Sequence, residues 1–215
     1  MTPTSAPVPI VCFGSSLTEG NPHAEMDKWP TRLQWHLDRS HPGAFKVYNR
    51  GIAGNTSANG LDRIEEAVLP LLPGHVISSF GINDCNVRPG RQTPRVGLAE
   101  FASNQREIIR LVRAAGGTPT LLAAHYLDPD VRPAPLRKYD QGNGQTYAEN
   151  FREYHRTIRQ MAQECACALI DMPALMLELG VKTADLVIDD GIHPTAEGNH
   201  FYAEQVYRQF SSRLG

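Results

Sequence analysis

The chain has 215 residues, of which 41% are hydrophobic and 20% are charged, and its net charge at pH 7 is −2 with a pI near 6.4. This composition favours a substantial buried core, excludes a disordered chain, and gives no electrostatic basis for nucleic-acid binding. A chain of this length is most simply one domain spanning residues 1–215.

The first residues predict a short flexible segment, residues 1–8, ahead of the first apolar run. This segment has neither the basic stretch nor the apolar stretch of a signal peptide. The longest apolar region, residues 68–82, is interrupted by Pro70, Pro73, Gly74 and His75, which is not typical of a membrane span. We therefore expect a cytoplasmic protein without a membrane span. The sequence indicates no oligomeric state.

Short apolar runs alternate along the chain with segments whose apolar residues have helical spacing. Five runs predict strands: Pro9–Phe13, Phe45–Tyr48, His75–Phe80, Thr118–Ala124 and Ala168–Ile170. Four stripes predict helices that pack on a core: Trp29, Leu33 and Leu37; Leu98, Phe101, Ile108 and Val112; Tyr147, Phe151, Tyr154, Ile158 and Met161; and Val206 and Phe210. Alternating strands and helices predict an α/β fold, a parallel sheet covered by helices on both faces. In such sheets ligands bind beyond the carboxyl ends of the strands.

A serine pair follows the first predicted strand, in the segment Phe13–Thr18. Serine is a weak nucleophile until a neighbouring base takes its proton, and a third group usually orients that base. Either Ser15 or Ser16 can supply the hydroxyl. The alternative interpretation is that Ser16 caps the following helix, where serine is favoured.

Two further polar segments follow the second and third strands. In the first, Asn49–Thr56, the glycines permit close backbone approach, so the Gly54 N–H is a candidate donor to substrate. In the second, Gly81–Asp84, the Asn83 side-chain amide is another candidate donor. The alternative interpretation is that these are turn residues only, and for Asp84 we prefer it.

A carboxylate and a histidine three residues apart, Asp190 and His193, precede the last predicted helix. One turn can hold both, so Asp190 can orient His193 as a base for the distant serine. The alternative is an Asx turn at Asp190 and a surface histidine, with Pro194 in the first turn of the helix. Together the segments predict a serine hydrolase whose polar groups gather at one edge of the sheet.

The long segment 126–144, rich in proline and glycine, departs from the short connections of compact domains. It follows the fourth strand on the same edge as the other segments, so we predict a loop that contacts substrate. A surface excursion without a function is the alternative.

The four cysteines have neither disulfide-scaffold nor zinc-site spacing, which predicts reduced thiols, with Cys12 in a buried strand. The predicted chemistry requires no metal and no organic cofactor. The remaining histidines carry no motif, and we interpret them as structural or solvent-facing: His23, His36, His41, His75, His125, His155 and His200.

Taken in order, the four segments resemble the SGNH, or GDSL-type, esterases and lipases, and the resemblance extends from Gly14 to His193. It implies a three-layer α/β/α flavodoxin-like fold with a five-stranded parallel sheet. It also implies roles for five residues: Ser16 as nucleophile, the Ser16 and Gly54 N–H groups with the Asn83 amide as the oxyanion hole, and Asp190 and His193 as the other members of the triad. The motif spacing selects Asp190 over Asp189 and Ser16 over Ser15.

One position departs from the family pattern, since Ser15 stands where the family usually has aspartate. The resemblance implies hydrolysis of carboxylic esters through an acyl-enzyme. The small domain with its long polar loop favours small, short-chain acyl groups, such as acetyl esters of carbohydrates. Thioesterase and lysophospholipase activity are alternatives on the same machinery. Two non-enzymatic alternatives also stay open: a flavin-binding flavodoxin-like protein, whose phosphate loop would be Gly14–Thr18, and a binder of acylated sugars that has lost turnover.

Overall fold

Five parallel strands form the central sheet of the computed structural model, which describes residues 6–88, 90–127 and 143–212. The strands are β1 (Val8–Gly14), β2 (Phe45–Gly51), β3 (His75–Ser79), β4 (Thr118–Ala123) and β5 (Ala168–Asp171). All five predicted strands are therefore confirmed. The predicted flexible segment 1–8 is wrong at its last residue, because Val8 pairs with Phe45. Residues 1–5 of that segment lie outside the described residues.

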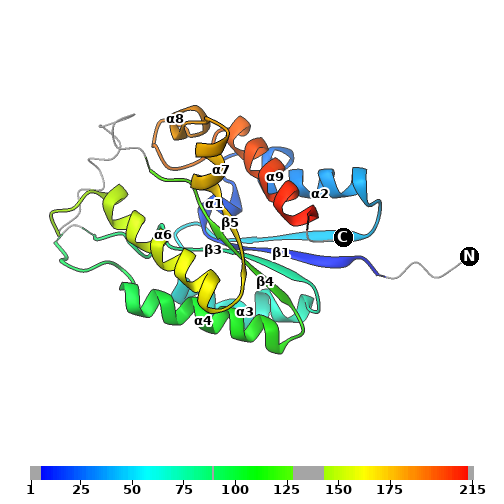
Figure 1. Cartoon of the computed structure of the whole chain (residues 1–215), viewed down its shortest axis with the longest axis horizontal. Helices are drawn as coiled ribbons and strands as arrows, with labels where there is room; N and C mark the ends of the chain where they lie inside the picture. Colours follow the sequence, from blue (N-terminus) through cyan, green and yellow to red (C-terminus); the bar gives the residue numbers. More distant parts are fainter. Residues whose placement is uncertain (1–5, 89, 128–142, 213–215) are drawn as a thin grey trace, which may run out of the picture.

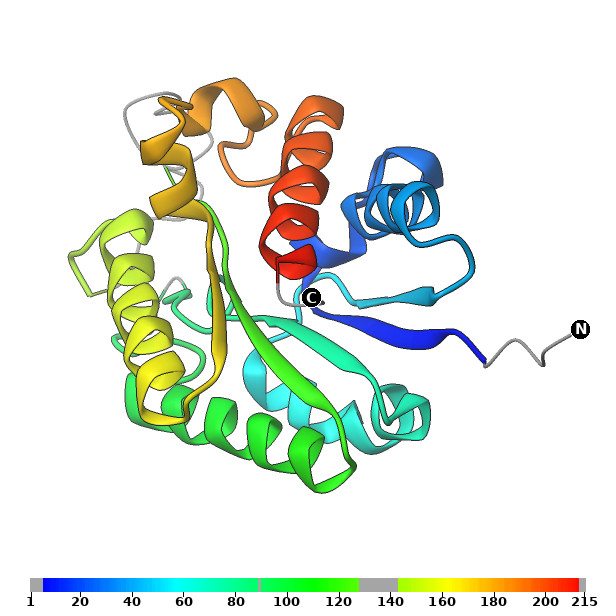
Figure 2. The same ribbon diagram turned by 45° about the vertical axis from the view of Figure 1, so that its right-hand side comes forward.

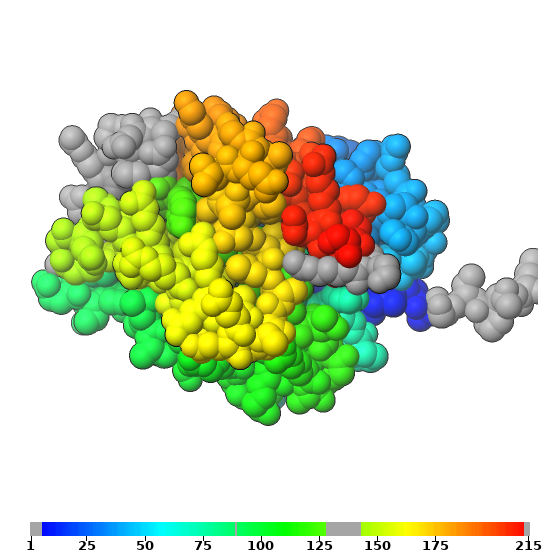
Figure 3. Space-filling view, viewed as in Figure 1, coloured from blue at the N-terminus to red at the C-terminus, as the bar shows by residue number. Residues whose placement is uncertain are grey.

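Helices cover both faces of the sheet, as Figures 1 and 2 show. The helices of the first face are α2 (Trp29–Ser40), α7 (Met172–Glu178) and α9 (Ala196–Ser211), and those of the second are α3 (Ser57–Ala67), α4 (Leu98–Ala114) and α6 (Tyr147–Glu164). The shorter helical elements are α1 (Ser16–Glu19), α8 (Thr183–Leu186) and the 3₁₀ turns η1 (Glu25–Asp27) and η2 (Leu69–Leu71). Atoms of α4, α6, α7 and α9, from both helical layers, are visible on the side of the molecule shown in Figure 3.

Alternation along the strands divides the core into two apolar layers, because successive side chains point to opposite faces of a sheet. In β1, Ile10 and Cys12 pack under α2 and α9, whereas Val11 and Phe13 pack under the helices of the other face. All four side chains are fully buried. The prediction that Cys12 lies in a buried strand is confirmed.

The strand order is β2–β1–β3–β4–β5, so the chain adds β2 on one side of β1 and β3 on the other. At such a switch point a crevice forms at the carboxyl ends of the two strands, here β1 and β3. Gly14, the last residue of β1, is level with Gly51 of β2 and Ser79 of β3. The polar segments that follow these three strands therefore begin at one place.

The helices beside that crevice begin at capping boxes, which satisfy N–H groups at helix starts that have no intrahelical partner. Thr56 and Asn59 cap α3 reciprocally, and Thr146 and Glu149 cap α6. These caps fix where α3 and α6 start.

Candidate active site

Three side chains from distant parts of the sequence form one hydrogen-bonded chain. The Ser16 hydroxyl lies 2.9 Å from His193 Nε2, and His193 Nδ1 lies 2.5 Å from an Asp190 carboxylate oxygen. When Nδ1 carries the imidazole proton and donates it to the carboxylate, Nε2 is the acceptor for the serine hydroxyl. This arrangement can take a proton from Ser16.

The start of α1 presents Ser16 to the crevice. Ser15 occupies the N-cap position without a side-chain cap bond and is buried, whereas Ser16 is the first helical residue and is partly exposed. The interpretation of Ser16 as a helix cap is therefore wrong. A Cβ atom on Gly14 would lie 2.3 Å from the Thr18 hydroxyl and 2.6 Å from the Ser79 carbonyl oxygen. Only glycine allows β1 to turn into α1 this tightly.

The turn that carries Asp190 holds His193 through both backbone and side chain. One carboxylate oxygen of Asp190 accepts the N–H groups of Ile192 (2.8 Å) and His193 (2.9 Å), and the other faces the imidazole. The Asx turn considered from the sequence is thus present together with the Asp–His pair. Burial raises the pKa of Asp190, but the hydrogen bonds from His193 and Ile192 outweigh it, so its pKa lies below the ordinary value.

A buried histidine supports this turn from the end of β4. His125 Nε2 lies 2.9 Å from the Ile192 carbonyl oxygen, and His125 Nδ1 lies 2.5 Å from the Tyr202 hydroxyl of α9. Burial lowers the pKa of His125 to about 4, so this imidazole is neutral at pH 7. The structural interpretation of His125 is confirmed.

The three candidate oxyanion donors lie around the same crevice. The Ser16 N–H is in the first turn of α1, where helical N–H groups have no intrahelical partner. The Asn83 amide donates one N–H to the Asn55 carbonyl oxygen at 3.1 Å and carries a second N–H. Gly54 has φ +75°, a conformation that favours glycine, and its carbonyl oxygen accepts a hydrogen bond from Arg95 at 3.0 Å.

A hollow of about 220 Å³ lies directly over the serine and the histidine. It is lined by Ser16, Ile82, Asn83, Asn86, Arg88, Arg95, Tyr147, Ile192 and His193. Gly54 is not among these lining residues, although the carbonyl oxygen of the next residue, Asn55, accepts the Asn83 amide. The structure thus brings Ser16, Asn83, Asp190 and His193 together and places Gly54 at the margin.

Sequence analysis missed two residues that hold these segments in place. Asp84, interpreted as a turn former, is fully buried and accepts both the N–H and the hydroxyl of Ser57 as well as the Gly81 N–H. Arg63 of α3 donates to the Gly14 carbonyl oxygen (3.0 Å) and to the Asn55 side chain (2.8 Å). The Ser57 partner of Asp84 and the Gly14 partner of Arg63 are distant in sequence, so no local pattern marks these contacts.

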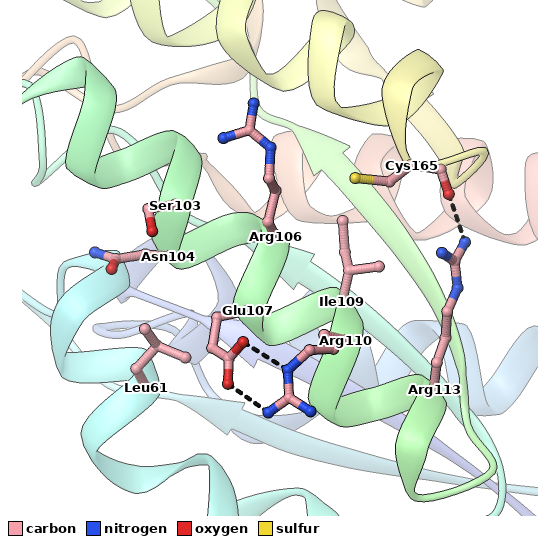
Figure 4. Close-up of a pocket in the computed structure, with 9 residues that line it drawn as sticks. All are labelled: Leu61, Ser103, Asn104, Arg106, Glu107, Ile109, Arg110, Arg113 and Cys165. Atoms are coloured by element: carbon pink, nitrogen blue, oxygen red, sulfur yellow. Dashed lines mark hydrogen bonds and ion pairs between the residues drawn. The ribbon is translucent and has the colours of Figure 1, made fainter.

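A larger hollow, of about 640 Å³, lies along α4 and is not this site. Figure 4 shows that its lining comes from α3, α4 and the end of α6, with Glu107 and Arg110 paired inside it. None of the triad residues lines it. Nearly all of the predicted substrate-contacting loop, 126–144, lies outside the described residues, as does any contact it makes with the site.

Within the described ranges, no group of three or more His, Cys, Asp or Glu side chains is placed to hold a metal ion. None of the described helices is both long enough and apolar enough to cross a bilayer.

Comparison with known proteins gives a consistent result. A family model described as the GDSL-like Lipase/Acylhydrolase family matches residues 12–201. An arylesterase of Vibrio mimicus is 23% identical over 95% of this chain and 89% of its own. An acetylxylan esterase of Geobacillus stearothermophilus is 25% identical over 77% of this chain and 72% of its own length. The fold matches a crystal structure of a lipase/acylhydrolase from Enterococcus faecalis, with a TM-score of 0.76, 22% identity and 96% of each chain covered.

Proposed function

Because the chain belongs to the GDSL-like lipase/acylhydrolase family and is therefore an esterase or acylhydrolase, we propose that it hydrolyses carboxylic esters of short-chain acyl groups. Acetyl esters of carbohydrates are the substrates we favour within that class. The observation that carries the proposal is the chain of contacts from Ser16 through His193 to Asp190, at 2.9 and 2.5 Å.

In the proposed mechanism, Ser16 attacks the ester carbonyl while His193 takes its proton, and Asp190 stabilises the imidazolium that forms. The negative oxygen of the tetrahedral intermediate is bound by the Ser16 and Gly54 N–H groups and the Asn83 amide. His193 then returns the proton to the leaving alcohol. Water, activated by the same imidazole, attacks the acyl-enzyme and releases the acid. No step uses a metal or an organic cofactor.

Two observations support small acyl groups. The hollow over Ser16 and His193 measures about 220 Å³ and its lining includes Asn83, Asn86 and two arginines, which favours a short and polar substrate over a long aliphatic chain. The relative named as an acetylxylan esterase supports acetyl esters of sugars. Hydrolysis of a thioester or a lysophospholipid would pass through the same acyl-enzyme, so the test below includes both substrates. Family membership favours catalysis over the flavin-binding and binding-only alternatives.

The test is steady-state hydrolysis of 4-nitrophenyl esters of increasing acyl length, beside acetylated xylo-oligosaccharides, an acyl-coenzyme A thioester and a lysophospholipid. The wild-type protein should prefer acetyl and propionyl esters. Ser16→Ala should abolish turnover, whereas Ser15→Ala, its matched control, should retain it. Preference for long acyl chains, or activity that survives Ser16→Ala, would contradict the proposal.

Asn83→Ala distinguishes an oxyanion donor from a binding residue. Removing one such donor typically lowers kcat by ~10²–10³. We expect this loss in kcat with little change in KM. A rise in KM alone would assign Asn83 to substrate binding.

A further inference from the structure

The loop between β3 and α4 carries three arginines, Arg88, Arg91 and Arg95. Backbone hydrogen bonds close the base of this loop, from Arg95 N–H to the Asn86 carbonyl oxygen (3.0 Å) and from Val96 N–H to that of Asp84 (3.1 Å). A turn within the loop is closed by the Arg91 N–H and the Arg88 carbonyl oxygen at 3.0 Å. A loop whose ends meet in this way is compact, so the three arginines are held on one short segment of backbone.

This loop encloses a basic hollow that adjoins the catalytic one. The hollow measures about 330 Å³ and is lined by Arg88, Arg91, Thr93, Pro94 and Arg95. Arg88 and Arg95 also line the hollow over Ser16 and His193. A substrate with its ester carbonyl at Ser16 therefore has guanidinium groups within reach of its remaining atoms.

The three arginines of this loop differ from two arginines on α4, which pair with carboxylates. On α4, Arg110 pairs with Glu107 at 2.6 Å, as Figure 4 shows, and Arg106 pairs with Glu164 at 2.9 Å. Within the described residues, no ion pair involves Arg88, Arg91 or Arg95. Among the residues that the structure describes, no carboxylate therefore neutralises the positive charge of this part of the surface.

Two acidic groups near the site, Asp84 and Asp190, are already engaged. Asp84 accepts the hydrogen bonds of Ser57 and Gly81, and Asp190 pairs with His193. Burial lowers the pKa of Arg95, and the charge of Arg88 lowers it further. The two guanidinium groups therefore repel each other, and a bound anion would relieve that repulsion.

We propose that Arg88, Arg91 and Arg95 form an anion subsite, and that the preferred substrates are esters that also carry a carboxylate or phosphate group close to the ester bond. Guanidinium groups suit both anions because their N–H donors match the paired oxygens. The proposal rests on the proposed function, since it places the anion relative to Ser16. The anion can belong to the acyl part or to the alcohol part of the ester.

Arg95 also positions the loop that carries Gly54, so a test of the subsite must not substitute Arg95. It donates to the Gly54 carbonyl oxygen, so its replacement would disturb the loop that carries a candidate oxyanion donor. Arg88 and Arg91 are exposed and make no such contact in the described structure. They are therefore the residues to vary.

The experiment compares matched esters that differ in one charge. On the alcohol side, these are 4-acetoxybenzoate and its neutral methyl ester; on the acyl side, the 4-nitrophenyl monoester of succinic acid and 4-nitrophenyl butyrate. A third pair, which differs by nearly two charges, is a diol acetylated on one hydroxyl and phosphorylated on the other, compared with the same monoacetate without the phosphate. We expect the anionic member of at least one pair to have the higher kcat/KM, and the preferred pair identifies where the anion lies.

Arg88→Gln should lower kcat/KM about tenfold for that anionic ester and less than about twofold for its neutral partner, in line with charge-assisted hydrogen bonds at a partly exposed site. The loss should lie mainly in KM and should shrink as sodium chloride is raised. Arg91→Gln should have the same selectivity. Arg110→Gln removes the same charge on α4, away from the site, so it should leave kcat/KM unchanged for both the anionic and the neutral ester.

Binding to the Ser16→Ala variant, measured by titration calorimetry with the same ester pairs, tests the subsite without turnover. The subsite is supported if an anionic ester binds more tightly than its neutral partner and if Arg88→Gln weakens the binding of that anionic ester. Equal binding of both members of every pair, or anion binding unchanged in Arg88→Gln and Arg91→Gln, overturns it. Hydrolysis of neutral esters with no charge preference would leave the proposed function intact and reject the subsite alone. Absence of all ester hydrolysis would reject the proposed function instead.

Discussion

Asp190 shows how one side chain can organise a whole turn. Its carboxylate accepts two backbone N–H groups and the imidazole, so the same residue fixes the position of His193 and the direction of its ring. The lowered pKa of Asp190 keeps the carboxylate ionised at the pH values where an imidazole changes charge. The negative charge is therefore present whenever His193 becomes positive.

Asp190→Asn tests this residue separately from the fold. Asparagine keeps one acceptor for the backbone N–H groups but removes the charge and faces His193 with an amide, which favours the wrong tautomer of the imidazole. We expect kcat to fall by ~10³–10⁴, as when the triad aspartate of a serine protease is replaced. Steady-state kinetics on 4-nitrophenyl acetate measure the loss. Asp189→Asn is the matched control, and it should retain activity because Asp189 is not the residue that contacts His193. Equal loss in both variants would argue against the specific role of Asp190.

At the scale of the elements, Asp84 joins the end of β3 to the start of α3. One carboxylate oxygen accepts the Ser57 N–H (2.8 Å) and hydroxyl (2.5 Å), and the other accepts the Gly81 N–H (3.0 Å). Burial raises the pKa of Asp84 and these hydrogen bonds oppose that rise. The residue next to Asp84 is Asn83, so this link also holds the candidate oxyanion amide.

Asp84→Asn should weaken both the link and catalysis. The amide nitrogen would face an N–H donor, which leaves a buried polar group without an acceptor and lowers the free energy of unfolding by about 1–3 kcal/mol. Loss of the fixed loop should also lower kcat, and more than it changes KM. Urea denaturation and steady-state kinetics measure the two effects. Asp62→Asn, at an exposed position of α3, should show neither. A stable variant with wild-type kcat would show that Asp84 does not position Asn83.

The elements also show what sequence can and cannot predict. The strands and the helices α2, α4, α6 and α9 were predictable because each repeats an apolar period locally. Helix α3 was not, since its segment Ser57–Ala67 buries few apolar side chains and begins at the Thr56 capping box, a polar signal. The triad residues were predictable because Asp190 and His193 are close in sequence. The links from Asp84 to Ser57 and from Arg63 to Gly14 were not, because only folding brings these partners near. His125 was interpreted as structural or solvent-facing, but its partners could not be named from the sequence for the same reason.

At the scale of the whole molecule, two neutral imidazoles are buried in the core. His155 of α6 is fully buried against the Tyr126 and Phe151 rings, and neither of its ring nitrogens has a hydrogen-bond partner among the described residues. Burial, assisted by the charge of Arg159, lowers the pKa of His155 to about 3. His125, described above, has a pKa of about 4.

Both shifts make the fold sensitive to acid. The folded pKa lies below the unfolded one, near 6.5, so the unfolded chain binds protons first as the pH falls. The contribution to stability is therefore fully present above pH ~6.5 and is lost between that pH and the folded values, at about 2 kcal/mol per histidine by pH 5. Loss of activity at acid pH then has two origins, loss of the catalytic base and unfolding.

His155→Leu separates these origins. Leucine has a similar volume and no nitrogens to bury, so stability at pH 7.5 should be retained or increased. Between pH 7.5 and pH 5, urea denaturation should show about 2 kcal/mol less loss in the variant than in wild type. His155→Gln, which is polar but does not titrate, should show the same reduced pH dependence. An unchanged pH dependence in both variants would show that His155 is not a source of acid sensitivity. The acid limb of the rate profile, measured where circular dichroism shows both proteins folded, should be identical in wild type and His155→Leu, because His193 and Asp190 are untouched.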